Sequence, residues 1–294
     1  MKFGITIPNN WGVEDVRQVI ELGKLAEELG YDSVWTMDHL FNIGFVRDRL
    51  DNKPYYHPLG VLSFLAAVTS RITLGTSVMV LPYHNPVELA KYAATLDQLS
   101  GGRFILGVGA GGTREESDAL GLPWERRGAI ANESMRVMRE LWTADFPAFH
   151  GKDWSFENLR FSPKPVQNPL PMWGGGASPG AMKRAATLGD GWHPNGVAPE
   201  NYRAAADQVR ALAEEAGRDP RNLVMSARAN LRMNPPAGST PSRFEGSSQD
   251  MHEAIADYER AGVEHIVLAP DSGDIPRLHD KMLQIAQEVM IHFR

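Results

Sequence analysis

The chain has 294 residues, no cysteine and a formal net charge of −6, from 36 acidic and 30 basic residues. This length can bury a large core, and the lack of cysteine excludes disulfide frameworks, thiolate chemistry, iron–sulfur clusters and Cys-ligated zinc. The charges are interspersed without a basic stripe and no apolar run approaches the roughly 20 residues of a membrane span, so we expect a cytoplasmic protein without a nucleic-acid or membrane partner.

Strand-like and helix-like segments alternate along the chain, which predicts a parallel sheet. The eight predicted strands are Phe3–Ile7, Ser33–Met37, Ile72–Val80, Arg103–Val108, Pro171–Trp173, Asp190–His193, Leu223–Met233 and His265–Ala269. The predicted helices are Glu14–Leu29, Pro58–Thr69, Pro86–Leu99, Arg126–Trp142, Pro179–Leu188, Glu200–Ala216, Asp250–Ala261 and Ile275–His292. Eight such units favour an α/β fold, a closed (β/α)8 TIM barrel formed as a single domain over residues 1–294.

Three insertions exceed what a minimal barrel needs. They are Phe41–His57 after the second strand, Phe146–Gln167 after the fourth β/α unit, and Met233–Ser248 after the seventh strand. The first and third follow strands, so they lie at the C-terminal face where barrel enzymes keep their chemistry. We interpret these two as lids over a substrate, with surface decoration as the alternative. The second alternates aromatic and polar residues around a turn and is predicted to form a hairpin.

The segment Trp173–Pro179 has the sequence Trp-Gly-Gly-Gly-Ala-Ser-Pro at the end of the fifth predicted strand. Ser178 can cap the next helix, and Pro179 suits the first helical position. Glycines let an anion approach the backbone, and a helix N-terminus offers free N–H groups and a positive dipole end. From these residues alone, a phosphate site and an ordinary strand-to-helix turn are equally compatible with the pattern.

The segment Gly107–Gly112 formally matches the dinucleotide fingerprint G-x-G-x-x-G. A Rossmann fingerprint opens directly into a helix and has an acidic residue at the end of the next strand. Here Thr113–Trp124 is predicted to be a polar loop, and no second strand follows at the right distance. We therefore expect the glycines to let a flat ring lie against the backbone.

Asp38 and His39 end the second predicted strand at the catalytic face. A histidine there can exchange a proton near neutral pH, and Asp38 could fix its tautomer. The alternative is a structural histidine at a strand end. His193 and His84 follow other strands on the same face and are weaker candidates. The histidines on the late elements, which we interpret as structural or solvated, are His252, His265, His279 and His292. No Asp, Glu and His residues stand at the sequence separations typical of metal-binding motifs, so no metal site is expected.

Four blocks of sequence together resemble the luciferase-like flavin and deazaflavin oxidoreductases of the luciferase-like monooxygenase superfamily. The blocks are Gly30–Trp35 with Asp38–His39, Leu74–Val78, Leu99–Phe104 with Leu106–Gly109, and Gly174–Gly176 with Leu188–Trp192. Their order and spacing cover nearly the whole chain, and the resemblance implies a barrel with a flavin-type ring at its C-terminal face. It also implies catalytic roles for His39 and Asp38. The implied cofactor-binding residues are Ser77, Val78, Gly107, Gly109, Ala110, Gly175, Gly176, Ala177 and His193. The phosphate would sit on Gly175, Gly176 and Ala177. A cis peptide at Ser77–Val78 would form a bulge behind the ring.

Within this superfamily the sequence is most similar to actinobacterial enzymes that use the deazaflavin coenzyme F420. It departs from the sugar-phosphate dehydrogenase branch at three points. Gly112 replaces the catalytic glutamate of that branch, and Ile43 replaces its substrate-stacking tryptophan. No Lys or Arg lies between Gly191 and Glu200 to take a sugar phosphate. The aromatic residues that instead suggest a flat, largely apolar substrate are Trp11, Phe41, Phe45, Trp124 and Trp192.

The leading hypothesis is therefore a hydride-transferring, F420-dependent oxidoreductase that acts on a small molecule as a homodimer. One alternative is an FMN-dependent monooxygenase on the same scaffold, and another is a non-catalytic flavin-binding protein. The tail of F420 is longer and more anionic than the phosphate of FMN. The cations that could meet it are Lys183 and Arg184 behind Gly176, and Arg47 and Arg49 on the first insertion.

Overall fold

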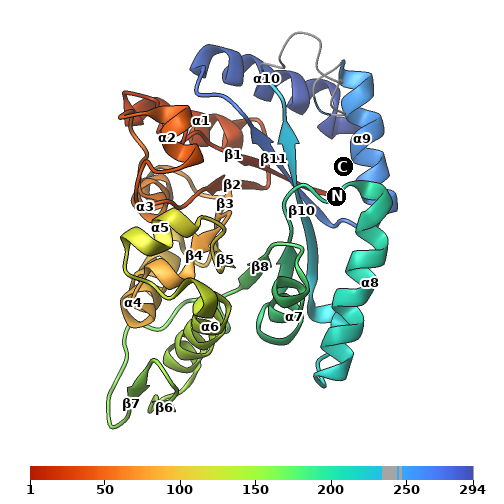
Figure 1. Ribbon diagram of the computed structural model, residues 1–294. Coiled ribbons are helices and arrows are strands. Elements are labelled where there is room, and N and C mark those ends of the chain that lie inside the picture. The colour runs from red at the N-terminus through yellow and green to blue at the C-terminus, as the bar shows by residue number, and fades with distance from the viewer. Residues whose placement is uncertain (234–243, 245–246, 294) are drawn as a thin grey trace.

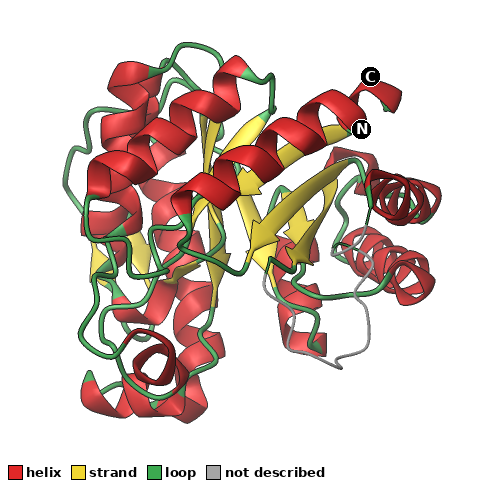
Figure 2. Ribbon diagram, turned by 90° about the horizontal axis from the view of Figure 1, so that it is seen from above, coloured by secondary structure: helices red, strands yellow, loops and turns green. Residues whose placement is uncertain are grey.

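The computed structural model describes residues 1–233, 244 and 247–293. Within these residues, parallel strands close into an eight-stranded barrel, with helices packed around it (Figure 1 and Figure 2). The barrel strands are β1 (Lys2–Thr6), β2 (Ser33–Thr36), β3 (Thr73–Thr76) with β4 (Met79–Val80), β5 (Phe104–Gly109), β8 (Met172–Gly175), β9 (Gly191–His193), β10 (Val224–Leu231) and β11 (His265–Pro270). The predicted TIM barrel is confirmed.

The main outer helices follow the strands in the predicted alternation. They are α1 (Val16–Glu28), α3 (Pro58–Val68), α4 (Pro86–Ser100), α6 (Arg127–Thr143), α7 (Pro179–Leu188), α8 (Pro199–Glu215), α9 (Ser248–Arg260) and α10 (Ile275–Glu288). Several begin where the sequence signals a start. Asn85 caps α4 by accepting from the N–H groups of Val87 and Glu88, and Ser178 caps α7, because these side chains satisfy N–H groups that lack a partner in the helix.

The third predicted strand, Ile72–Val80, is interrupted. It forms β3 and β4, and the peptide bond between Ser77 and Val78, which lies between them, is cis. This is the bond at which the resemblance implies a cis peptide. β3 pairs with β2 and with the start of β5, whereas β4 pairs with the end of β5. The interruption therefore displaces Ser77 and Val78 from the regular ladder at the C-terminal ends of the strands.

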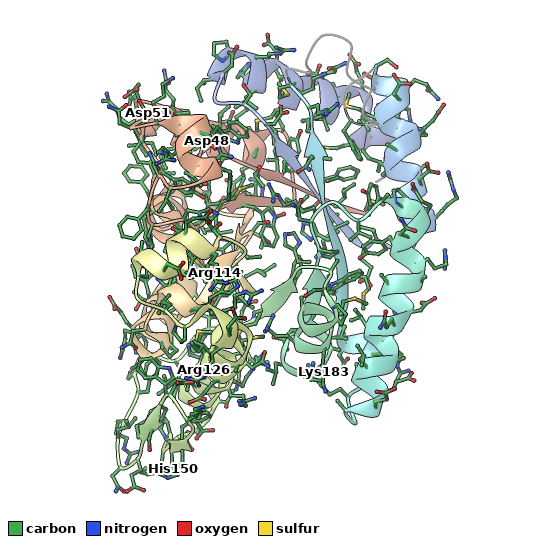
Figure 3. All side chains as sticks on the ribbon, in the orientation of Figure 1. Asp48, Asp51, Arg114, Arg126, His150 and Lys183 are labelled. Carbon is green, nitrogen blue, oxygen red and sulfur yellow. The ribbon has the colours of Figure 1, made fainter. Side chains whose placement is uncertain are left out.

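The insertions differ in structure. Phe41–His57 contains the short helix α2 (Phe45–Leu50). Phe146–Gln167 contains the predicted hairpin, formed by β6 (Phe149–His150) and β7 (Ser155–Phe156), and His150 lies at its tip (Figure 3). Most of Met233–Ser248 lies outside the described residues.

The prediction of a polar loop over Thr113–Trp124 is wrong. A helix, α5 (Arg114–Ala119), forms there, because Glu116 and Ser117 are buried on its inner side and hold it against the barrel.

Aromatic rings fill the barrel interior. Trp35 stacks on His193 with ring centroids 5.0 Å apart and packs against Trp173 at 5.3 Å. His265 meets the edge of Trp173 at 5.3 Å. The interior is a packed core, and the described chain ends lie side by side outside it, where the Met1 amine donates to the Phe293 carbonyl (Figure 1).

Candidate functional site

A cavity of about 840 Å³ opens at the C-terminal ends of the strands. Residues from most barrel strands, from α2 and from the starts of α6 and α7 line it. Of the residues predicted to bind the cofactor or act in catalysis, those in its wall are Asp38, His39, Ser77, Val78, Gly109, Ala110, Gly175, Gly176 and His193. The structure thus gathers residues from five separate sequence regions around one space.

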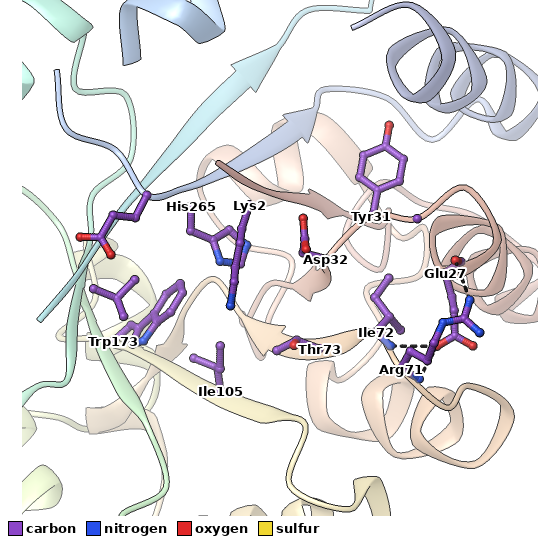
Figure 4. Close-up of a pocket in the computed structure, with 13 residues that line it drawn as sticks. Lys2, Glu27, Tyr31, Asp32, Arg71, Ile72, Thr73, Ile105, Trp173 and His265 are labelled. Carbon is purple, nitrogen blue, oxygen red and sulfur yellow. Dashed lines mark hydrogen bonds between the residues drawn. The ribbon is translucent and has the colours of Figure 1, made fainter. Parts of the chain in front are cut away.

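A second cavity, of about 430 Å³, lies at the N-terminal end of the barrel (Figure 4). Its wall carries charges of both signs, among them Lys2, Asp32 and Arg71, and Glu27 accepts from the backbone N–H groups of Arg71 and Ile72. Trp173 and His265 close it toward the barrel interior. Barrel enzymes carry out their chemistry at the C-terminal face, so the larger cavity is the candidate site.

His39 forms a close pair with Glu116. The Nδ1 atom of His39 lies 2.5 Å from a carboxylate oxygen of Glu116, whose other oxygen accepts from the N–H groups of Leu40 and Phe41. Burial alone would raise the pKa of Glu116, but the His39 hydrogen bond and charge together with these N–H groups lower it below the usual value. Glu116 is therefore an anion at neutral pH and leaves the Nε2 atom of His39, which has no bonding partner among the described residues, for the cavity.

The prediction that Asp38 fixes the tautomer of His39 is wrong. One Asp38 oxygen accepts from the backbone N–H of Val80 and lies 2.7 Å from Nε2 of His84. The other oxygen, Oδ1, is buried and has no hydrogen-bond partner in the part of the chain that the structure describes. The strand end turns the two adjacent side chains apart, so Asp38 supports β4 and presents one unused acceptor at the cavity wall.

His193 lies beneath the interruption of the third strand. Its Nε2 atom is 2.8 Å from Oγ of Ser77, and its Nδ1 atom is 2.7 Å from Oγ of Ser226. Burial, followed by the charge of Arg228, lowers the pKa of His193 to about 3. Both ring nitrogens are engaged by serine hydroxyls, so His193 positions Ser77 and the adjoining Val78.

The glycines around Val78 are required by packing. A Cβ on Gly109 would lie 2.7 Å from Cγ2 of Val78, and one on Gly175 would lie 2.8 Å from its Cγ1. A Cβ on Gly107 would lie 1.9 Å from the Thr76 carbonyl oxygen, and Gly107 itself does not line the cavity. Because these glycines lack a Cβ, the side chain of Val78 packs directly against strands β5 and β8 and forms a flat apolar part of the cavity wall.

The predicted phosphate loop continues this wall from Gly175, which lies against Val78. Gly176 has φ +93°, which favours glycine, and Gly176, Ser178 and Gly180 line the cavity at the N-terminus of α7. Ala177 is not among the lining residues. The first-turn N–H groups of a helix lack intrahelical partners, so this wall offers donors and a positive dipole end to an anion.

Two arginines flank the phosphate loop. Arg184 donates to Oδ1 of Asn132 and to the Gly128 carbonyl, and Arg127 donates to the Trp124 carbonyl. Both line the cavity, and no carboxylate of the described chain pairs with either. Burial and then the charge of Arg127 lower the pKa of Arg184. Lys183, another predicted partner of the cofactor tail, is exposed (Figure 3) and is not among the residues that line the cavity.

The five predicted aromatic residues differ in their relation to the cavity. Trp11 and Phe45 line the cavity. Trp192 is fully buried and donates from Nε1 to the Gly176 carbonyl, so it supports the phosphate loop from the core. Phe41 and Trp124 do not line the cavity. The cavity is therefore less aromatic than the sequence suggests.

Four residues of the site were not predicted from the sequence, and three of them, Tyr55, Arg127 and Arg228, line the cavity. Glu116 was placed in a loop, and its neighbour Glu115 is equally acidic, so no local signal separates the two. Tyr55 and Arg127 also went unnoticed. Arg228 had a usable signal, because it is the one charge in the strand sequence Val-Met-Ser-Ala-Arg-Ala-Asn-Leu, and strand positions in a barrel that carry a charge mark the interior wall or the mouth.

The described residues contain neither a candidate metal site nor a candidate membrane-spanning helix. No group of three or more His, Asp or Glu side chains there could hold a metal ion. No helix in the same residues is long and apolar enough to cross a bilayer.

Comparison with known proteins gives a family and several relatives. The family model described as luciferase-like monooxygenase matches residues 1–235. An uncharacterized protein of Mycobacterium tuberculosis is 32% identical over 210 residues, which are 68% of this chain and 72% of that protein. An F420-dependent glucose-6-phosphate dehydrogenase of Amycolatopsis mediterranei is 34% identical over 187 residues, 60% of this chain and 52% of that protein.

Relatives with the other cofactor also occur. An FMNH2-dependent dimethylsulfone monooxygenase of Pseudomonas putida is 29% identical over 212 residues, 71% of this chain and 56% of that protein. Among solved structures, the coenzyme F420-dependent tetrahydromethanopterin reductase of Methanopyrus kandleri superposes with a TM-score of 0.79 at 21% identity, covering 100% of this chain and 99% of that one. At this identity the superposition shows the shared barrel fold.

Proposed function

The chain belongs to the luciferase-like monooxygenase family, and on that premise we propose that it is an oxidoreductase that transfers a hydride between coenzyme F420 and a small organic substrate. The family and its relatives support a flavin- or deazaflavin-dependent oxidoreductase. The observation that carries the choice of F420 is the pair Arg127 and Arg184, two guanidinium groups beside the phosphate loop that no carboxylate of the described residues neutralises.

The cavity wall fits such a cofactor at three places. Val78, set between Gly109 and Gly175, offers a flat apolar surface on which a tricyclic ring would rest. The unused Oδ1 of Asp38 is a buried acceptor suited to a ring N–H. The N-terminus of α7 would take the phosphate, because its first-turn N–H groups lack intrahelical partners and its dipole end is positive.

The two arginines favour the longer anionic tail. Fixed like charges at close range repel each other, and they are stabilised when an anion binds between or beside them. One phosphate can be held by the helix N-terminus alone, so FMN leaves the guanidinium groups with little to bind. The phosphate and carboxylates of the F420 tail would supply several anions along this rim.

The residues around the cavity would then have separate roles in the reaction. A bound deazaflavin supplies a ring carbon that gives or takes a hydride. The Nε2 atom of His39 faces the same cavity and would give a proton to the substrate or take one from it. Glu116 holds the opposite nitrogen and stabilises the charged imidazolium. The apolar side chains of Val78 and Phe45 line the cavity and would shield the transfer from water.

We do not propose the substrate of the Amycolatopsis relative, glucose 6-phosphate, for this protein. Gly112 lines the cavity with open space around it, and it supplies no carboxylate for the proton transfer expected in the sugar-phosphate branch. No Lys or Arg stands between Gly191 and Glu200 to meet a sugar phosphate. We propose a substrate with a flat body.

A fluorescence titration with F420 and with FMN, each at low and high ionic strength, tests the proposal. We expect tighter F420 binding and a preference that shrinks as salt rises, because tail contacts are partly exposed and screened. Arg184→Gln should weaken F420 binding more than FMN binding. Tighter FMN binding under both conditions would move the protein to the monooxygenase branch. Tight cofactor binding without turnover of any screened substrate would support a non-catalytic binding protein.

A further inference from the structure

The interior end of the cavity contains a second group of cationic and donor atoms, separate from the phosphate loop. Arg228 projects from β10 into the cavity wall. Its side-chain contact is with the sulfur of Met37 at 3.6 Å, and its Nε atom is buried without a hydrogen-bond partner. No carboxylate of the described residues pairs with it. A buried guanidinium in this position is costly unless an anion joins it.

Arg49 reaches the same region from α2. It donates from Nη2 to the Asn10 carbonyl at 3.0 Å, and its guanidinium lies over the ring of Trp11, 4.3 Å from the centroid. Its Nε atom is also buried and unpaired within the described chain. Stacking on Trp11 fixes the plane of the guanidinium and leaves one edge free.

Tyr55 adds a neutral donor. Its hydroxyl is buried and has no partner among the described residues, and its ring centroid lies 5.9 Å from that of His39. Burial, and then the charge of Asp38, raise the pKa of Tyr55, so the phenol keeps its proton. The three side chains interact electrostatically with one another, since Arg49 and Arg228 both act on Tyr55 and Arg49 acts on Arg228.

Strand order separates this group from the phosphate loop. The loop follows β8, whereas Arg228 lies on β10, Arg49 binds the segment after β1, and Tyr55 follows β2. In the closed barrel β1 and β2 lie across the mouth from β8, whereas β9 alone separates β10 from β8. A cofactor phosphate at this loop would direct the tail outward from β8, so the anion that suits Arg49 and Arg228 would belong to a different molecule beside His39.

We propose that Arg49, Arg228 and Tyr55 form a carboxylate subsite for the substrate, and that the substrate is a planar organic acid whose flat body lies against Trp11 and Phe45. This inference rests on the proposed function. A carboxylate suits the subsite because it is planar and accepts two parallel hydrogen bonds from a guanidinium. The Tyr55 hydroxyl would donate a further bond to it, next to the proton-exchanging nitrogen of His39.

Calorimetric titration with cinnamate and with neutral cinnamamide, which has the same flat body, tests the subsite in the full-length protein with and without F420. We expect cinnamate to bind about 10-fold or more tightly than cinnamamide in both forms. Arg228→Met and Arg49→Gln should each remove most of that preference and leave the cinnamamide affinity and the F420 affinity within about twofold. Arg49 lies on the surface helix α2, so its variant keeps the test usable if Arg228→Met fails to fold.

Arg184→Gln is the matched control, because it removes a cavity arginine at the phosphate loop. It should weaken F420 and leave cinnamate unchanged. Equal affinity for cinnamate and cinnamamide overturns the proposal, as does loss of cinnamate binding when F420 is loaded, which would assign the arginines to the cofactor. The titration without cofactor remains informative if the protein fails to bind F420, so failure of the subsite and failure of the proposed function are distinguishable.

Discussion

The Nδ1 atom of His39 lies 2.5 Å from Oε2 of Glu116, a residue 77 positions further along the chain. This pair joins the end of β2 to the helix α5, and the same carboxylate accepts from the backbone N–H groups of Leu40 and Phe41. Glu116 therefore fixes both the histidine ring and the start of the first insertion. The orientation of the candidate acid–base group depends on a residue outside its own strand.

Replacing His39 tests the proton transfer. We expect His39→Ala to lower turnover by about two to four orders of magnitude, the usual effect of a positioned general acid or base. The affinity for F420 should change by less than about threefold, because His39 is not part of the phosphate loop. Steady-state turnover and cofactor titration measure the two effects. Turnover within about twofold of the unmodified protein would make His39 a structural residue.

Replacing Glu116 tests the pairing. Glu116→Gln keeps the shape and can still accept from Leu40 and Phe41, but it cannot balance the charge of the imidazolium. We expect turnover to fall by about 10-fold or more, with an unchanged circular dichroism spectrum. Because the pKa of Glu116 lies below its usual value, the unmodified enzyme should show no titration of this group between about pH 5 and 8. An equally active Gln variant would contradict the pairing.

Replacing Gly176 tests whether the phosphate loop binds the cofactor. We expect Gly176→Asp to raise the dissociation constant of F420 by about 100-fold or more, since a carboxylate would lie where the phosphate binds and a side chain is strained at φ +93°. Gly60→Asp is the control, because Gly60 is exposed on α3, does not line the cavity, and a Cβ there meets no atom within 4 Å. Fluorescence titration gives the affinities. Unchanged affinity in the Asp variant would remove this loop from the cofactor site.

The lowered pKa of His193 makes the free energy of unfolding depend on pH. The folded protein lowers its pKa from 6.5 to about 3, so the unfolded chain binds more protons between these values. The stability contribution is complete above about pH 6.5 and is lost as the pH falls toward 3. Between pH 7.5 and 5.5 this one group should cost about 1.4 kcal/mol of unfolding free energy.

Urea unfolding of His193→Asn at both pH values checks this figure. The variant should be less stable at pH 7.5, because Ser77 and Ser226 lose a partner, but its loss of stability on acidification should be smaller by about 1.4 kcal/mol. Identical losses in the two proteins would show that His193 is not buried neutral. His265, whose pKa burial also lowers to about 3, contributes equally to both proteins and cancels.

The sequence alone determined the barrel and the end of it at which the candidate site lies. Apolar periodicity and glycine or proline boundaries are local properties, so eight alternating units, the hairpin at Phe149–Phe156 and the capped helix after Ser178 could be predicted. Parallel strands place their C-terminal ends at one face, which brought His39, Val78 and Gly176 to a common cavity.

The tertiary structure alone determined which side chains are hydrogen-bonded to one another in the site. Two adjacent residues at a strand end, Asp38 and His39, point to different neighbours, and Glu116 rather than Glu115 is buried against His39. Arg49 and Arg228, 179 positions apart by their numbering, meet in one wall. Such pairings depend on which side chains packing buries across the barrel mouth, and hydrogen-bond geometry over a few ångströms is not encoded in the spacing of residues along the chain.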